Sequence, residues 1–147
     1  MVAPSSPRTR QAAFAVVVIV LGLSGVWQGR GAFRVQAVEA RYPAAGRFAA
    51  TLPDNAVFIS NQHSGSLRYY ANRLTLRFEW LDPDMYVTAV EQLFKHGRPV
   101  FVVLDDWERE VFKARYSGVA DLSWLDRPPV LVAADSVSFY QLPSPPR

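Results

Sequence analysis

Hydrophobic and polar positions follow two different patterns along this chain. Residues 12–29 carry no charged side chain and are almost continuously apolar. From Pro53 onward, short apolar runs alternate with stretches in which apolar residues recur every three or four positions. A short apolar run is typical of a buried strand, and the longer period is typical of an amphipathic helix. The pattern therefore predicts one apolar N-terminal helix followed by a small α/β domain.

The predicted elements of the α/β domain alternate along the chain. The run from Pro99 to Leu104 is typical of a central strand covered on both faces. Strand–helix alternation favours parallel pairing, and the turn at Asp135-Ser136 favours a final antiparallel pair. We therefore expect an N-terminal transmembrane helix followed by a small three-layer, mainly parallel sheet with a C-terminal antiparallel strand pair. The expected strands are residues 56–60, 74–78, 99–104, 129–134 and 137–142, and the expected helices are residues 64–73, a helix from Pro83 to a C-cap at Gly97, and residues 106–116.

This pattern predicts five segments. The connector between the membrane and the domain should continue as a helix toward Arg41, and Pro43 should end or kink it. The segments are a cytoplasmic tail at residues 1–11, a transmembrane helix at residues 12–29, a helical connector at residues 30–52, an extracytoplasmic α/β domain at residues 53–142 and a tail at residues 143–147.

The apolar segment has three interpretations. A membrane-spanning helix needs about 20 apolar residues, and Arg8 and Arg10 supply the positive flank typical of the cytoplasmic side. A cleaved signal peptide has the same basic and apolar regions, but Arg30 and Arg34 precede the small-residue site at 35–37. A buried helix of a soluble protein is the third interpretation. We favour a single-pass anchor in the cell inner membrane, with the soluble domain on the periplasmic or extracellular side.

Composition excludes several classes of protein. Half of the 147 residues are hydrophobic and 20% are charged, so the chain is not disordered as a whole. It has no cysteine, which excludes disulfide scaffolds, thiol catalysis and cysteine zinc sites. With two histidines, a multi-histidine metal site is not expected either. We therefore expect no metal site and no cofactor.

The net charge of +3 does not indicate nucleic-acid binding. Residues 1–47 contain six arginines and one acidic residue, Glu39, and the remaining chain is slightly acidic. The positive charge therefore flanks the apolar segment instead of covering a face of the folded domain. This position of the positive charge predicts the lipid bilayer as a partner.

The first cluster of candidate binding residues follows the first strand. The Ser64-Gly65-Ser66 entry to a helix can present backbone N–H groups to an anion, and it can equally be an ordinary helix cap. It lacks the spacing of a dinucleotide or P-loop fingerprint and of a nucleophile elbow. The candidate ligand or partner contacts in this cluster are His63, Ser64, Gly65, Ser66, Arg68, Tyr69 and Arg73.

The second cluster follows the central strand and comprises Asp105, Asp106 and Glu108. Paired acids at a strand end are typical of metal-binding or general-base sites. Asp105 and Glu108 also have the spacing of a capping box, which favours a structural role. The carboxyl ends of parallel strands are where open α/β sheets bind ligands, so we expect both clusters at one edge.

Two long segments carry a family resemblance. LPDNAVFISNQHSGSLRYYANRLTLRFEWLD and GRPVFVVLDDWEREVFKARY resemble the C-terminal extracytoplasmic domain of bacterial dolichyl-phosphate-mannose–protein mannosyltransferase-like enzymes, within the glycosyltransferase C superfamily. The resemblance implies a lipid-phosphate-linked sugar donor. The catalytic acidic residue of such enzymes lies in a loop between early transmembrane helices, so no catalytic residue is carried over to this chain.

Three functions remain open. The favoured one is a non-catalytic, membrane-anchored domain, either a fragment of a polytopic glycosyltransferase or its accessory partner, which contacts that enzyme or a polyprenyl-phosphate-linked sugar. The second is a small anchored or secreted hydrolase that uses His63 and Ser64 or Asp105 and Asp106. The third is a purely structural interaction module.

Overall fold

The computed structural model describes residues 7–31 and 37–144. The chain divides into two compact units, Met1–Ala37 and Val38–Arg147. The second unit therefore begins near residue 38 instead of at the predicted residue 53. The second half of the predicted connector belongs to the α/β domain, because Ala45 and Ala49 are fully buried in its core.

The first unit contains the predicted apolar helix. Helix α1 spans Pro7–Gly29, so it begins before residue 12 and includes the basic residues Arg8 and Arg10. Its segment Arg10–Gly29 has a mean hydropathy of 1.9, and its apolar side chains are exposed. This helix is compatible with a membrane anchor or a signal peptide. Residues 35–36 of the proposed cleavage site lie outside the described residues.

The second unit is an α/β domain with a five-stranded mixed sheet. The strand order is β2-β1-β3-β5-β4. β1 pairs in parallel with β2 and β3, whereas β5 pairs antiparallel with β3 and β4. The C-terminal antiparallel pair is confirmed, but it joins the sheet through β5 beside the central strand, so the sheet is mixed. The strands are β1 Val57–Ile59, β2 Leu74–Leu76, β3 Val100–Asp105, β4 Leu131–Ala133 and β5 Val137–Gln141.

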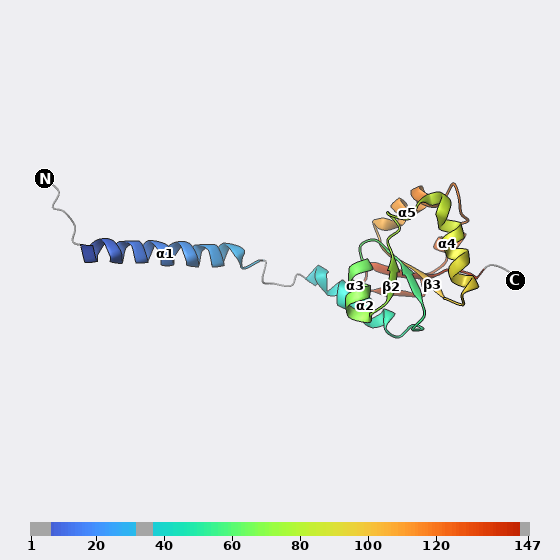
Figure 1. The fold of residues 1–147 in the computed structure, drawn as a ribbon, viewed down its shortest axis with the longest axis horizontal. Helices are drawn as coiled ribbons and strands as arrows, with labels where there is room; N and C mark the ends of the chain where they lie inside the picture. Colours follow the sequence, from blue (N-terminus) through green and yellow to red (C-terminus); the bar gives the residue numbers. More distant parts are fainter. Residues whose placement is uncertain (1–6, 32–36, 145–147) are drawn as a thin grey trace. The chain divides into compact units, whose positions relative to one another are not determined.

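Helices lie on both sides of the strands, as Figure 1 shows. The α2–α3 face is the side that packs against α2 (Arg41–Ala49) and α3 (Ser64–Ala71). The α4–α5 face packs against α4 (Pro83–Lys95) and α5 (Glu108–Tyr116). Two short 3-10 helices, Ala37–Ala40 and Ser123–Asp126, precede α2 and β4. All six residues of β3 are buried, which confirms its prediction as the central covered strand.

The ends of α4 follow the predicted signals. The Asp82 carboxylate accepts a hydrogen bond from the Asp84 N–H at 3.1 Å, and Pro83 is the first helical residue. Gly97 follows the helix with φ of +66°, a conformation that glycine adopts without steric cost. The sequence therefore determines both ends of this helix locally.

Helix α2 corrects the prediction for the connector. Pro43 neither ends nor kinks a helix there, because it is the third residue of α2. The first N–H groups of a helix have no intrahelical acceptor, so proline is tolerated in the first turn. In the middle of α2, Gly46 lies against the Cβ atom of Tyr70 on α3. The two helices can approach this closely because Gly46 has no side chain.

Candidate functional site

The three parallel strands end at one edge of the sheet, and the two predicted clusters meet there. His63 follows β1, and Asp105 is the last residue of β3. The His63 imidazole Nε2 lies 3.2 Å from the Asp105 carboxylate Oδ1. Residues 42 positions apart in the sequence are thus brought into direct contact. This edge is the candidate functional site.

A buried group of charged and polar side chains, which we call the polar centre, lies at this edge. It comprises Arg41, His63, Asp105 and Glu108. His63, Asp105 and Glu108 are at most 1% exposed. The Arg41 guanidinium Nη1 lies 3.4 Å from Asp105 Oδ2, so Asp105 lies between a histidine and an arginine. The polar centre therefore ties the start of α2 to the ends of β1 and β3.

Glu108 forms half of the predicted capping box. Its carboxylate accepts the Asp105 N–H at 2.9 Å and the Gln62 N–H at 3.0 Å. The Asp105 carboxylate does not complete the box, because it faces His63 and Arg41 instead. Asp105 and Glu108 consequently have different roles: Glu108 holds the strand ends, and Asp105 holds the imidazole.

Burial sets the charge states in the polar centre. Burial lowers the pKa of His63 below its ordinary value, even though the Asp105 carboxylate acts in the opposite direction. Burial raises the pKa of Glu108, and its two backbone N–H donors partly offset this change. His63 is accordingly assigned as neutral near pH 7. The proton must sit on Nε2, because a carboxylate only accepts hydrogen bonds.

The serines beside His63 differ from the prediction. The Ser64 hydroxyl donates to the Asn61 carbonyl oxygen at 2.9 Å. Ser66 is the hydroxyl near the imidazole, with Oγ 3.4 Å from Nδ1, and it also donates to the His63 carbonyl oxygen at 3.0 Å. The arrangement Ser66–His63–Asp105 has the order of a nucleophilic triad, but the imidazole is fully buried and the serine is held by its own helix.

A groove of about 400 Å³ lies beside the polar centre. Arg68 comes from α3, and Arg77 and Trp80 come from the loop after β2. The Arg77 guanidinium stacks over the Trp80 ring at 4.2 Å, and its Nε donates to the Asn61 side-chain oxygen at 2.9 Å. Trp80 is 76% exposed. The residues lining the groove are Ser64, Gly65, Arg68, Thr75, Leu76, Arg77, Trp80 and Leu81.

The other predicted contacts lie away from this groove. Tyr69 is exposed and contacts Tyr70 edge to face. Asp106 is exposed and lines another cavity with Arg109 and Glu110. Asp105 also lines that cavity, but its carboxylate contacts His63 and Arg41. Arg73 has a structural position, described next.

Arg73 is 6% exposed and binds the end of α2. Its guanidinium donates to the carbonyl oxygens of Ala49, Ala50 and Leu52 at 3.1, 3.1 and 2.8 Å. It also contacts the exposed carboxylate of Asp54 at 2.9 Å. These bonds satisfy carbonyls at the helix end, so Arg73 holds α2 in place and does not face the groove.

The sequence analysis missed Arg41, Arg77 and Trp80. Arg77 and Trp80 follow β2 directly, so the rule that ligands bind at strand ends would have found them. Arg41 comes from a helix that was predicted as a connector, and no spacing in the sequence links it to Asp105. Among residues 7–31 and 37–144, no group of three or more histidine and acidic side chains is arranged to hold a metal ion.

No family model, no curated protein and no solved structure matches this chain. The candidate site therefore has to be interpreted from its own geometry.

Proposed function

We propose that this protein is a membrane-anchored, non-catalytic accessory domain that binds a phosphate-bearing, lipid-linked sugar. In this proposal α1 is a single-pass anchor in the inner membrane, and the α/β domain, a small three-layer unit, lies on the periplasmic or extracellular side. The ligand would be a polyprenyl-phosphate-linked sugar used by a polytopic glycosyltransferase. The observation that carries the proposal is the groove beside the polar centre, with Arg68, Arg77 and Trp80 in its wall.

The groove has the chemistry that such a ligand requires. Arginine binds phosphate through parallel N–H groups, and Arg68 and Arg77 both line the groove. The exposed ring of Trp80 offers a flat apolar surface to a sugar. The stacking of Arg77 on Trp80 and its bond to Asn61 fix the direction of the guanidinium before a ligand arrives. Such pre-organisation reduces the entropy cost of binding.

The polar centre supports the groove without taking part in chemistry. The Glu108 carboxylate accepts the Gln62 N–H, and the His63 imidazole contacts the Asp105 carboxylate. These two contacts fix the loop that leads into Ser64 and Gly65. The resemblance to mannosyltransferase-like enzymes agrees with a sugar-phosphate ligand. It supplies no catalytic residue, in keeping with an accessory role.

Binding by the full chain in lipid nanodiscs tests the proposal. Calorimetric titration should show saturable binding of a polyprenyl-phosphate hexose and weaker binding of inorganic phosphate, with no binding of the unphosphorylated polyprenol. Arg68→Glu should weaken binding by about tenfold or more, because it replaces attraction for the phosphate with repulsion.

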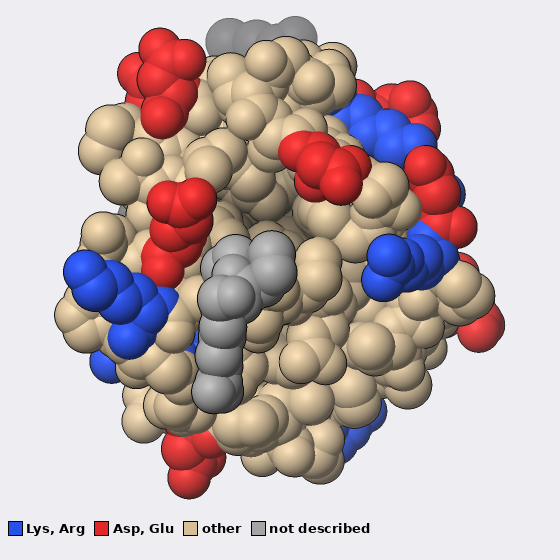
Figure 2. Space-filling view, turned by 90° about the vertical axis from the view of Figure 1, so that its right-hand side faces the viewer, with Lys and Arg blue, Asp and Glu red and all other residues tan. Residues whose placement is uncertain are grey.

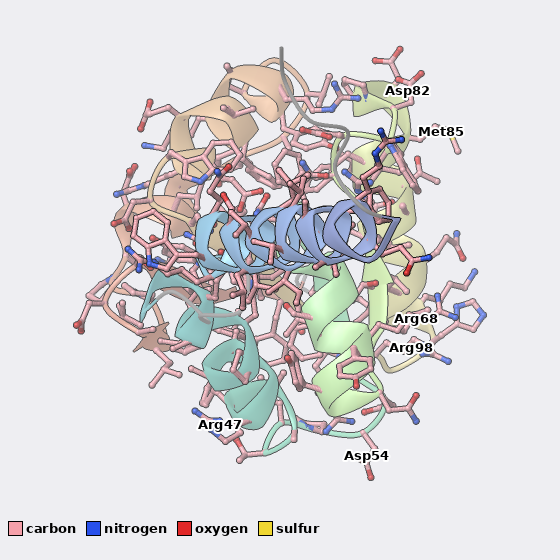
Figure 3. The ribbon with its side chains drawn as sticks, turned by 90° about the vertical axis from the view of Figure 1, so that its left-hand side faces the viewer. Arg47, Asp54, Arg68, Asp82, Met85 and Arg98 are labelled. Carbon is pink, nitrogen blue, oxygen red and sulfur yellow. The ribbon has the colours of Figure 1, made fainter. Side chains whose placement is uncertain are left out.

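Arg47→Glu is the matched control for this experiment. Arg47 is exposed on α2, and Figure 3 shows Arg47 and Arg68 on different sides of the domain. The control should leave binding unchanged. Equal binding by wild type and Arg68→Glu, or equal binding of the polyprenol, contradicts the proposal.

The second candidate function is hydrolysis, which the chain of contacts from Ser66 through His63 to Asp105 favours. It predicts that the purified chain cleaves esters or phosphoesters, and that Ser66→Ala and His63→Ala each abolish this activity. Absence of activity in the wild type removes this candidate. If the chain is stable but neither binds the ligand nor shows activity, a structural interaction module remains as the third candidate function.

A further inference from the structure

A separate cavity of about 300 Å³ opens on the α4–α5 side of the domain. Figure 2 shows a hollow between acidic side chains on the side of the domain that carries α4. The wall combines one face of α4 with the loop after α5 and the end of the chain beyond β5. The residues lining it are Tyr86, Val87, Val90, Glu91, Phe94, Val119, Ala120, Asp121, Trp124, Leu142 and Pro143.

The apolar lining of the cavity gives the first indication of a ligand, and the ring of Tyr86 belongs to it. Tyr86 is 3% exposed and lines the cavity, and its hydroxyl has no hydrogen-bond partner within residues 7–31 and 37–144. A buried hydroxyl without a partner costs about 1–3 kcal/mol. Its neighbour Tyr116, stacked on it at 4.2 Å, does have partners, because it donates to the Phe78 and Leu81 carbonyls. Because the Tyr86 hydroxyl oxygen is itself enclosed, Tyr86 meets the cavity with its ring and not with its hydroxyl.

The charge of the rim gives the second indication. Glu91 and Asp121 are exposed and line the cavity, and within the described residues no lysine or arginine does. The Ser123 N–H and hydroxyl donate to Asp121 at 2.9 and 3.1 Å, which lowers the pKa of this carboxyl. The rim is thus negative around an apolar floor formed by Val90, Phe94 and Trp124.

We propose that this cavity binds a small apolar molecule that carries one ammonium group, such as an arylalkyl amine. The ring would lie against Phe94 and Trp124. The ammonium group would lie at the rim, where the carboxylates attract it and aromatic faces add a cation–π contribution. This site is distinct from the groove at the carboxyl ends of the strands, and it does not depend on the proposed function.

Calorimetry with the full chain in nanodiscs tests this proposal, and empty nanodiscs supply the blank. The probes are 2-phenylethylamine, 2-phenylethanol and 3-phenylpropionate, which share a ring and differ in the polar group. The amine should bind about five- to tenfold more tightly than the alcohol at low salt, and the carboxylate most weakly. Equal binding of amine and alcohol, or no saturable binding of the amine, overturns the proposal.

Three substitutions locate the binding. Glu91→Gln should remove most of the preference for the amine, whereas Glu110→Gln, an exposed residue of α5 that does not line the cavity, should preserve it. Arg68→Glu should leave amine binding unchanged, which separates this site from the groove. Full retention of the amine preference by Glu91→Gln would refute the site.

Discussion

The two faces of the sheet are stabilised in different ways. The α4–α5 face is a cluster of large aromatic rings, in which Phe112 contacts Phe78, Tyr86, Tyr116 and Trp124 at centroid distances of 4.9–5.9 Å. The α2–α3 face brings two helices together over Ala45, Gly46 and Ala49 and places charged groups beneath them. The α4–α5 face therefore relies on contacts between aromatic rings, whereas the α2–α3 face combines its own buried apolar cluster with close approach of two helices and with buried polar contacts.

The two faces also lie next to different candidate binding sites. The apolar cavity opens on the α4–α5 side of the domain. The polar centre instead fixes the loops at the carboxyl edge, where the groove lies.

Removing the central ring should damage the α4–α5 face most. Phe112 is fully buried, and Phe112→Ala should lower the free energy of unfolding by about 3–5 kcal/mol, because it removes apolar burial and leaves a cavity. Denaturant unfolding of the domain, followed by circular dichroism, measures this change. Val111→Ala, at an exposed neighbour, should change stability by less than about 0.5 kcal/mol. Similar losses for the two substitutions would show that the aromatic rings do not provide most of the stability of this face.

On the α2–α3 face, removing one buried polar residue should also have a large effect. Arg73→Met keeps much of the apolar stem but removes the donors to the Ala49, Ala50 and Leu52 carbonyls, and should cost about 2–4 kcal/mol. The contact with Asp54 adds little, since that carboxylate is fully exposed. Arg68→Met, at an exposed position, serves as the control for denaturant unfolding. A loss below about 0.5 kcal/mol for Arg73→Met would contradict the role given to it.

Close approach of α2 and α3 can be tested by adding one methyl group. Gly46→Ala would normally favour a helix, but here the new Cβ meets Tyr70, and we expect a net loss of about 1–3 kcal/mol. Gly118→Ala meets no atom within 4 Å and controls for the added methyl group. The double variant Gly46→Ala, Tyr70→Gly should recover part of the loss. A Gly46→Ala variant as stable as the wild type would mean that the helices are farther apart than the structure shows.

The polar centre predicts a pH dependence that the aromatic face lacks. Because the pKa of His63 is lower in the fold than its ordinary 6.5, the unfolded imidazole takes up a proton first, and stability falls as the pH drops below about 6.5. The raised pKa of Glu108 has the opposite effect on stability: it favours the fold as the pH falls toward 4.5, the ordinary pKa of this group. His63→Asn should therefore flatten the loss of stability between about pH 7 and pH 5.

The exposed His96 is the control for this pH experiment. His96→Asn removes the other histidine of the chain, whose ring is exposed and bonds to the Gln92 carbonyl oxygen at its own helix end, so comparing the two variants separates His63 from His96. Unfolding free energies at several pH values measure both variants. A His63→Asn variant with the same pH dependence as the wild type would mean that His63 is not the group that titrates.

Local patterns predicted most elements of this fold. Apolar runs located all five strands, and Pro83 and Gly97 marked both ends of α4. The ends of the strands shifted by one or two residues, because hydrogen-bond partners, and not apolarity, decide where a strand stops. The pairing of β5 with β3 was missed, since no local pattern states which free edge a hairpin will join.

The candidate site could be predicted only in part. His63 and Asp105 were predicted to share one edge, because both follow parallel strands, and the structure places them in contact. Arg73 was predicted as a ligand contact from its positive charge, because the sequence alone does not show that its side chain is buried. Arg41 reaches Asp105 from a helix that lies 64 positions earlier (105 − 41), and only the folded chain brings that pair together.

The strand order also bears on how this domain meets other copies of itself. The two outermost strands, β2 and β4, are each three residues long. Unpaired N–H and carbonyl groups at a sheet edge can recruit another chain, and short edge strands limit how many such groups are offered. Edge strands of three residues therefore offer little template for edge-to-edge association between copies of this domain.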